Sequence, residues 1–181
     1  MVLSFTNVFI KRNISAYFRE NDFPQKRLPN FLISLPAALI GGFLSREMLY
    51  QKALSCFNAT SFNLEDPLFS KDISYYILQR PFFTSLYELV SALWLFIIFY
   101  TVVYYLVAVS PSQGPFSVHE LKNKRIMRHN LINIAVFFII KTFSYKFLKE
   151  GILYSSFLDV KGAGYVDVNV WLVYYSIAPF L

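Results

Sequence analysis

The chain has 181 residues and a formal net charge of +6. Apolar residues make up 56% of it and charged residues only 15%, against roughly 25% charged residues in soluble domains, so a soluble fold would expose large apolar patches and an integral membrane protein is predicted. The basic residues directly flank apolar runs, which is typical of the ends of membrane spans and argues against a nucleic-acid-binding protein.

Residues 1–30 are predicted to form a basic, amphipathic N-terminal arm. An apolar stretch from Met1 to Ile10 precedes its basic residues, which is the wrong order for a cleaved signal peptide. The arm is basic and free of acidic residues before Glu20, which suggests a mitochondrial address. The prediction is an uncleaved, internally targeted membrane protein. The basic residues of the arm are Lys11, Arg12, Arg19, Lys26 and Arg27.

Residues 31–50 are predicted to form the first membrane helix, and Pro36 is expected to kink it. Four small residues in this helix are spaced as two small-xxx-small pairs, which let a second helix approach closely. They are Ala37, Ala38, Gly41 and Gly42. We interpret them as a helix-packing face, with a flexible, glycine-containing membrane helix as the alternative.

Residues 51–84 are predicted to connect two membrane helices and to include a short surface helix between Ser70 and Arg80. Residues 85–109 are predicted to form the second membrane helix. Its last 21 residues carry no charge, and about 20 apolar residues suffice to cross a bilayer. Ser85 and Glu88 have the spacing of a capping box at its start.

Residues 117–150 are predicted to form one long helix with a basic head and a membrane body. Ser117 and Glu120 form a second capping-box pattern, and Gly151 is expected to end the helix. Lys141 lies within the body, where it is expected to extend toward the membrane surface. The alternative is that it pairs with a buried carboxylate or lines an ion path.

The basic head of this helix is the predicted ligand site. Basic side chains just outside the hydrocarbon gain about 1 kcal/mol each from anionic lipid. The four predicted lipid-headgroup residues are Lys122, Lys124, Arg125 and Arg128. The predicted ligand is an anionic lipid such as cardiolipin, and the alternative is that these charges only set the topology of the chain.

Residues 151–181 are predicted to be a turn followed by an apolar docking tail. The apolar part, 168–181, would span only about 21 Å as a helix, so it is predicted to be a half-span. The predicted fold is therefore all-α, with about three transmembrane helices and a short C-terminal half-span.

The sequence shows no pattern of an active site. One cysteine, Cys56, cannot form an intramolecular disulfide or a cysteine-based metal site. The two histidines, His119 and His129, would lie about 15 Å apart on a helix, so they cannot share one metal ion. Motifs of metalloproteases, nucleotide-binding proteins and hydrolases are absent from the sequence. The prediction is a protein that is not an enzyme and has no cofactor.

Leu121-Lys122-Asn123, which follows a membrane helix and a polar loop, resembles the region before the histidine boxes of sterol desaturases and fatty-acid hydroxylases. That family binds two irons through many histidines. Because this chain has two histidines, the resemblance implies at most a degenerate lipid hydroxylase or desaturase-like membrane enzyme.

The main functional hypothesis is a non-catalytic accessory subunit that packs against other membrane subunits of a hetero-oligomeric complex. The specific expectation is a mitochondrial inner-membrane respiratory-chain or ATP-synthase complex. The positive-inside rule then places the N-terminal arm and the second basic segment in the matrix. A channel or transporter subunit is the remaining alternative.

Overall fold

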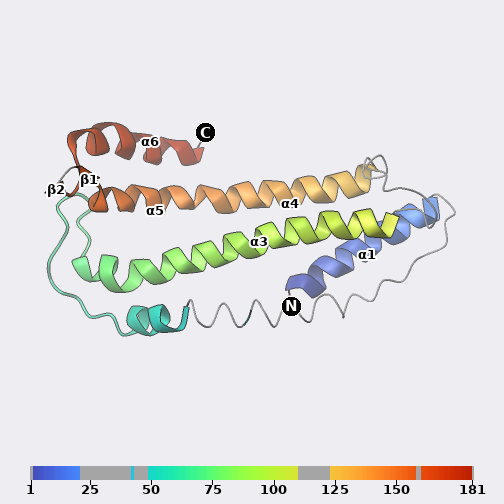
Figure 1. Ribbon diagram of the computed structural model, residues 1–181, viewed down its shortest axis with the longest axis horizontal. Coiled ribbons are helices and arrows are strands. Elements are labelled where there is room, and N and C mark those ends of the chain that lie inside the picture. The colour runs from blue at the N-terminus through green and yellow to red at the C-terminus, as the bar shows by residue number, and fades with distance from the viewer. Residues whose placement is uncertain (1, 21–41, 43–48, 110–122, 158–159, 181) are drawn as a thin grey trace. The chain divides into compact units, whose positions relative to one another are not determined.

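The computed structural model describes residues 2–20, 42, 49–109, 123–157 and 160–180 (Figure 1). The chain divides into two compact units, Met1–Ala135 and Val136–Leu181. Most of the described residues are helical, which confirms the predicted helical class. They also include a loop at 58–72 and a pair of two-residue strands.

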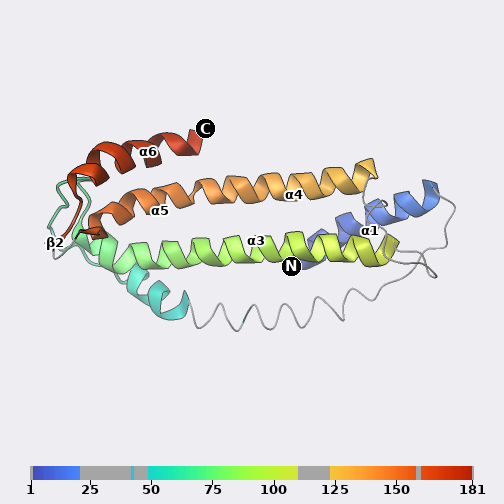
Figure 2. The same cartoon turned by 45° about the horizontal axis from the view of Figure 1, so that its top comes forward.

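The first unit contains helix α1 (Val2–Glu20), helix α3 (Arg80–Val109) and the beginning of helix α4 (Lys124–Thr142) up to Ala135. Figures 1 and 2 show α1 lying beside the C-terminal part of α3. A further helical segment, 49–57, contacts the beginning of α3. There the ammonium group of Lys52 donates a hydrogen bond to the hydroxyl of Ser85.

The helix that leads into α3 begins earlier than the sequence patterns predict. Residues are helical from Ile73 and pass through a π-helical turn, η1 (Tyr75–Gln79), into α3. Asp72 caps this beginning, because its carboxylate accepts a 2.7 Å hydrogen bond from the amide of Ser74, as N-cap side chains do. Ser85 is buried inside α3, so the prediction that it caps the second membrane helix is wrong. The predicted surface helix is likewise part of this longer helix.

Asp72 also organises the loop before the helix. Its carboxylate accepts hydrogen bonds from the hydroxyl of Ser61 and from the amides of Phe62 and Asn63. The bond from Ser61 and those from Ser74 and the amide of Phe62 hold the pKa of the Asp72 carboxyl well below its ordinary value. Asn63 has a φ of 54°, a left-handed conformation that asparagine tolerates better than most residues.

The second unit contains the end of α4 and helix α5 (Ser144–Gly151), followed by the 3₁₀ turn η3 (Ile152–Tyr154). Strands β1 (Ser156–Phe157) and β2 (Val160–Lys161) pair antiparallel, with Ser156 opposite Lys161. The chain then forms η4 (Asp167–Trp171), α6 (Leu172–Ile177) and η5 (Ala178–Phe180). Hydrogen bonds from the hydroxyl of Ser155 and the amide of Gly164 lower the pKa of Asp167.

The predicted long helix differs from the observed one at two points. Asn123 is not helical, and α4 begins at Lys124 because the Asn123 side chain accepts a 3.0 Å bond from the amide of Arg125. A turn at Phe143 then separates α4 from α5. The hydroxyls of Thr142 and Ser144 bond to carbonyls of the preceding turn, at 3.1 and 2.7 Å, and such bonds bend helices.

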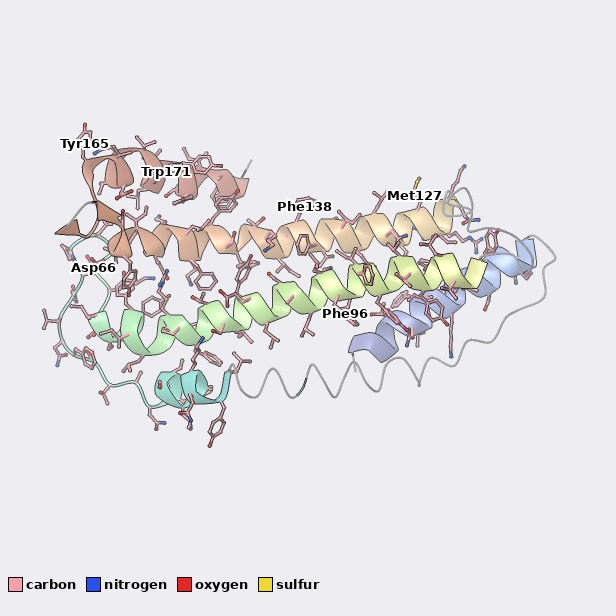
Figure 3. All side chains as sticks on the ribbon, viewed as in Figure 1. Asp66, Phe96, Met127, Phe138, Tyr165 and Trp171 are labelled. Carbon is pink, nitrogen blue, oxygen red and sulfur yellow. The ribbon has the colours of Figure 1, made fainter. Side chains whose placement is uncertain are left out.

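Two helical stretches, Tyr75–Ala108 and Lys124–Tyr154, have the length and apolar composition needed to cross a membrane. Many of their large apolar side chains are exposed, including Phe96, Met127 and Phe138, which are labelled in Figure 3. A bilayer core is about 30 Å thick, and helices of 34 and 31 residues exceed that thickness at about 1.5 Å per residue.

Candidate functional site: a basic cleft between α1 and α4

One face of α1 is buried against α3. Its buried residues recur every three or four positions, as a single helical face requires, and they are Thr6, Asn7, Ile10, Ile14 and Tyr17. The three apolar ones, Ile10, Ile14 and Tyr17, form a core with residues of α3 and α4, namely Tyr100, Tyr104, Tyr105, Ala108 and Ile126. Lys11 and Arg12 of α1 are exposed, so the packing of the apolar face directs its cations away from the core.

Two hydrogen bonds fix the position of α1 along α3. The hydroxyl of Tyr100 donates a 2.8 Å bond to the side-chain oxygen of Asn7. The side-chain amide of Asn13 donates a 2.9 Å bond to the hydroxyl of Tyr105. Both tyrosines are buried, and a buried polar group that loses its partner costs about 1–3 kcal/mol. The two pairs therefore disfavour sliding of one helix along the other.

Tyr105 also joins α3 to α4. Its hydroxyl lies 2.7 Å from Nδ1 of His129, and the two rings meet edge to face at 87°. The hydroxyl oxygen also accepts from Asn13, and the tautomer of the imidazole sets which partner donates in the bond with His129. A second bond between these helices runs from the indole nitrogen of Trp94 to the backbone oxygen of Asn133, at 2.9 Å.

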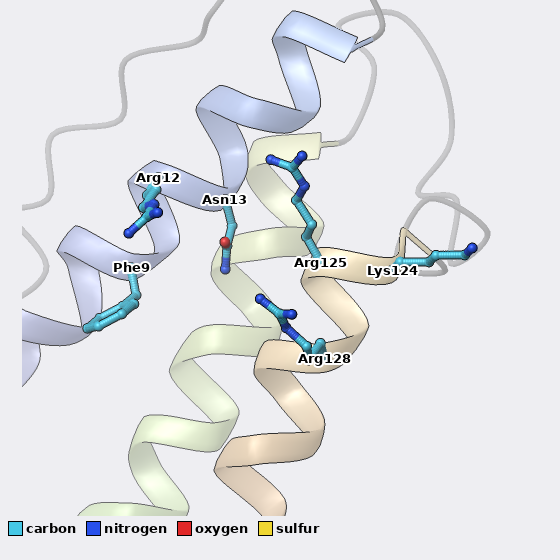
Figure 4. A pocket seen from close by; sticks show the side chains of 6 residues that line it. All are labelled: Phe9, Arg12, Asn13, Lys124, Arg125 and Arg128. Carbon is cyan, nitrogen blue, oxygen red and sulfur yellow. The ribbon is translucent and has the colours of Figure 1, made fainter.

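This packing leaves a cleft of about 610 Å³ between α1 and the first turns of α4 (Figure 4). Among the residues that the structure describes, six side chains line the cleft, and none of these six is a carboxylate. They are Phe9, Arg12 and Asn13 of α1 with Lys124, Arg125 and Arg128 of α4. Figure 4 shows that both helices contribute cationic side chains to it. Arg125 and Arg128 extend toward α1 in this view, whereas Lys124 extends away from it.

The electrostatics of the cleft favour an anion for a second reason. The first turn of a helix carries a partial positive charge, so cations there are destabilised. Lys124, Arg125 and Arg128 all lie in the first two turns of α4, whose first turn has no acidic residue. A bound anion would offset the repulsion among these charges and the helix N-terminus together.

The structure brings together three of the four predicted headgroup residues, Lys124, Arg125 and Arg128. Lys122 lies outside the described residues. Sequence reasoning missed Phe9, Arg12 and Asn13, because their place in the cleft depends on how α1 packs against α3. The cationic, amphipathic character of 1–20 was the only available signal for them.

The predicted packing face falls mostly outside the described residues, which include Gly42 but not Ala37, Ala38 or Gly41. Gly42 is exposed, and a Cβ atom added there would meet no atom within 4 Å. Within the described ranges, no group of three or more His, Cys, Asp or Glu side chains could hold a metal ion. His119 also lies outside the described residues. The prediction that the chain is not an enzyme stays a prediction.

The fold and the cleft together define a class: a helical protein with two helices apolar enough to cross a membrane and a cationic cleft beside one of them. The comparisons give the family. The model of the uncharacterised protein family UPF0182 matches residues 4–181, and the chain belongs to this family.

Relatives that match this chain include bacterial proteins named UPF0182 protein. One from Caldicellulosiruptor saccharolyticus is 35% identical over 176 residues, which are 95% of this chain and 19% of that protein. One from Desulforamulus reducens is 36% identical over 68% of this chain and 13% of its own length. One from Clostridium tetani is 26% identical over 97% of this chain and 21% of its own length. The chain thus spans about a fifth or less of these relatives. No solved structure matches the chain.

The comparisons overturn the main functional hypothesis. Membership of a bacterial family contradicts an accessory subunit of a mitochondrial respiratory-chain or ATP-synthase complex, and with it the mitochondrial inner membrane and a matrix-facing N-terminus. The error arose from the N-terminal arm. A helix that packs one face against α3 and exposes the other to water has the same amphipathic, basic pattern as a mitochondrial targeting segment. The composition of the arm therefore does not identify an organelle.

Proposed function

We propose that this chain is a membrane-embedded segment that binds the headgroup of an anionic phospholipid in the cleft between α1 and α4. The observation that carries the proposal is that Arg12, Lys124, Arg125 and Arg128, from two helices, line one cleft, with no carboxylate among its described lining residues. Guanidinium groups bind phosphate oxygens through paired, charge-assisted hydrogen bonds. Asn13 adds a neutral polar group, and Phe9 adds an apolar wall.

The proposed orientation follows from the same charges. The helices Tyr75–Ala108 and Lys124–Tyr154 would cross the bacterial membrane, and the cleft would lie on the cytoplasmic side because Lys and Arg are enriched there. We retain 31–50 as a proposed third crossing helix and 168–181 as a proposed half-span. The exposed apolar faces of α3 and α4 would contact lipid or further membrane helices.

The order of charged and apolar residues along both helices supports a headgroup site at the cleft. The half of α1 before Lys11 is largely apolar, whereas Lys11 and Arg12 follow it directly. In α4, Lys124, Arg125 and Arg128 precede the apolar run that begins at Leu131. Each helix therefore changes from charged to apolar beside the cleft, as helices do at the surface of a bilayer.

Retention of lipid by the protein tests this function. The chain is reconstituted in nanodiscs with equal amounts of phosphatidylglycerol and phosphatidylcholine, and native mass spectrometry counts the lipids that remain bound after release from the disc. We expect an excess of phosphatidylglycerol that shrinks as salt rises, because salt screens exposed charges. Equal retention of both lipids at low salt would contradict the proposal.

A further inference from the structure

We propose a second lipid site in the second unit, a groove between α5 and α6 that holds one anionic phospholipid by its headgroup and the upper part of an acyl chain. The groove measures about 650 Å³ and shares no lining residue with the cleft between α1 and α4. The proposal rests on the proposed membrane crossing of the helix Lys124–Tyr154, but not on lipid binding in the cleft between α1 and α4.

The groove has one charged end and one apolar end. Lys146 and Lys149 of α5 line it, together with the ring of Tyr175 from α6. Ile139 and Phe143 also line it, and these two side chains are 62% and 64% exposed. Such a distribution matches a molecule that carries a negative charge at one end and a hydrocarbon chain at the other.

The lengths agree with a lipid in one leaflet. Ten residues separate Ile139 from Lys149, or about 15 Å along a helix, which is about half of a 30 Å hydrocarbon core. Lys149 lies near the end of the helical stretch Lys124–Tyr154, where a lysine reaches the headgroup layer. A phospholipid whose phosphate contacts Lys146 and Lys149 would therefore have its chain beside Phe143 and Ile139.

Aromatic side chains support the same placement. Trp171 stacks on Tyr175 with ring centroids 5.7 Å apart and planes 26° apart, and Tyr174 contacts both rings. Trp and Tyr are enriched at the interface between membrane and water. The cluster places a fluorescent residue next to the wall of the groove.

Quenching of Trp171 fluorescence tests the site. The chain is reconstituted in phosphatidylcholine vesicles that contain a fixed mole fraction of one lipid with brominated acyl chains, which quench tryptophan on close approach. The chain has one other tryptophan, Trp94. Subtracting the fluorescence of the Trp171→Phe variant therefore leaves the fluorescence of Trp171 alone. Brominated phosphatidylglycerol is expected to quench Trp171 at least twofold more than brominated phosphatidylcholine.

The preference should disappear in Lys146→Gln with Lys149→Gln and persist in Lys146→Arg with Lys149→Arg. It should also persist in Lys141→Gln, since Lys141 lies over the Phe137 ring and is not among the groove-lining residues. Equal quenching by both lipids in the unaltered chain would overturn the proposal, as would a preference that survives the double glutamine variant. Stronger quenching by a brominated free fatty acid than by phosphatidylglycerol would overturn a phospholipid as the occupant.

Discussion

The hydroxyl of Tyr105 lies 2.7 Å from Nδ1 of His129 and joins α3 to α4. The same oxygen accepts a 2.9 Å hydrogen bond from Asn13, which joins α1 to the pair. Tyr105 is fully buried, so water cannot replace either partner. This one side chain therefore holds together the helices that enclose the basic cleft.

Replacing Tyr105 with phenylalanine should destabilise the first unit. The change leaves Asn13 and His129 without their shared partner, which should cost about 1–3 kcal/mol. Thermal unfolding in detergent, followed by circular dichroism, should show a lower Tm. Tyr165→Phe is the matched control, since Tyr165 is 83% exposed, and its Tm should not change. Equal Tm values for the two variants would contradict the role assigned to Tyr105.

Asp72→Asn should loosen the beginning of the helix that leads into α3. The carboxylate accepts bonds from the amides of Phe62, Asn63 and Ser74, and a neutral amide is a weaker acceptor for them. Hydrogen exchange at these three amides should become faster in the variant. Glu65→Gln, an exposed neighbour, should leave all three rates unchanged. Protection that is the same in Asp72→Asn and in the unaltered chain would show that the cap is unimportant.

The same bonds predict a pH dependence. The hydrogen bond from Ser61 and those from the backbone amides lower the pKa of Asp72 in the folded chain. A lowered pKa means that the ionised carboxylate stabilises the fold above the unfolded pKa, and that this contribution is lost as pH falls through the folded pKa. The amides of Phe62, Asn63 and Ser74 should therefore stay protected from hydrogen exchange at pH values below the ordinary pKa of an aspartate carboxyl. Loss of protection above pH 5 would contradict this assignment.

The sequence alone predicted features whose residues are neighbours within one segment of the chain. It did not predict features that arise from the packing of two segments. Lys124, Arg125 and Arg128 could be grouped because they follow one another on one helix. Arg12 could not be added to them, since its position depends on Tyr105 and Asn13, which meet only in the folded chain. The turn at Phe143 was not predicted, because no Pro or Gly stands near it to indicate a break in the helix. Asp72 is a residue type that favours helix N-caps, and it marks the observed beginning of the helix that leads into α3. The capping-box spacing of Ser85 and Glu88 instead led to a predicted beginning that is too late in the sequence.

The orientation of the helices can be tested with cysteines. Cys56 precedes the helix Tyr75–Ala108 and Lys124 follows it, so the two positions should lie on opposite sides of the membrane. In right-side-out vesicles, an impermeant maleimide should label Cys56. It should label Lys124→Cys, made in a Cys56→Ser background, only after permeabilisation. Labelling of both positions in sealed vesicles would show that this helix does not cross.

The most direct measurement of the proposed function compares two variants that each lose two positive charges. Arg12→Gln with Arg128→Gln removes one cation from each wall of the cleft, whereas Lys11→Gln with Arg19→Gln removes two exposed cations of α1 that do not line it. Each lost contact should cost about 1 kcal/mol. The excess of phosphatidylglycerol over phosphatidylcholine retained in native mass spectrometry should therefore fall about tenfold or more in the first variant and stay unchanged in the second. The same excess in both variants would contradict a headgroup site in this cleft.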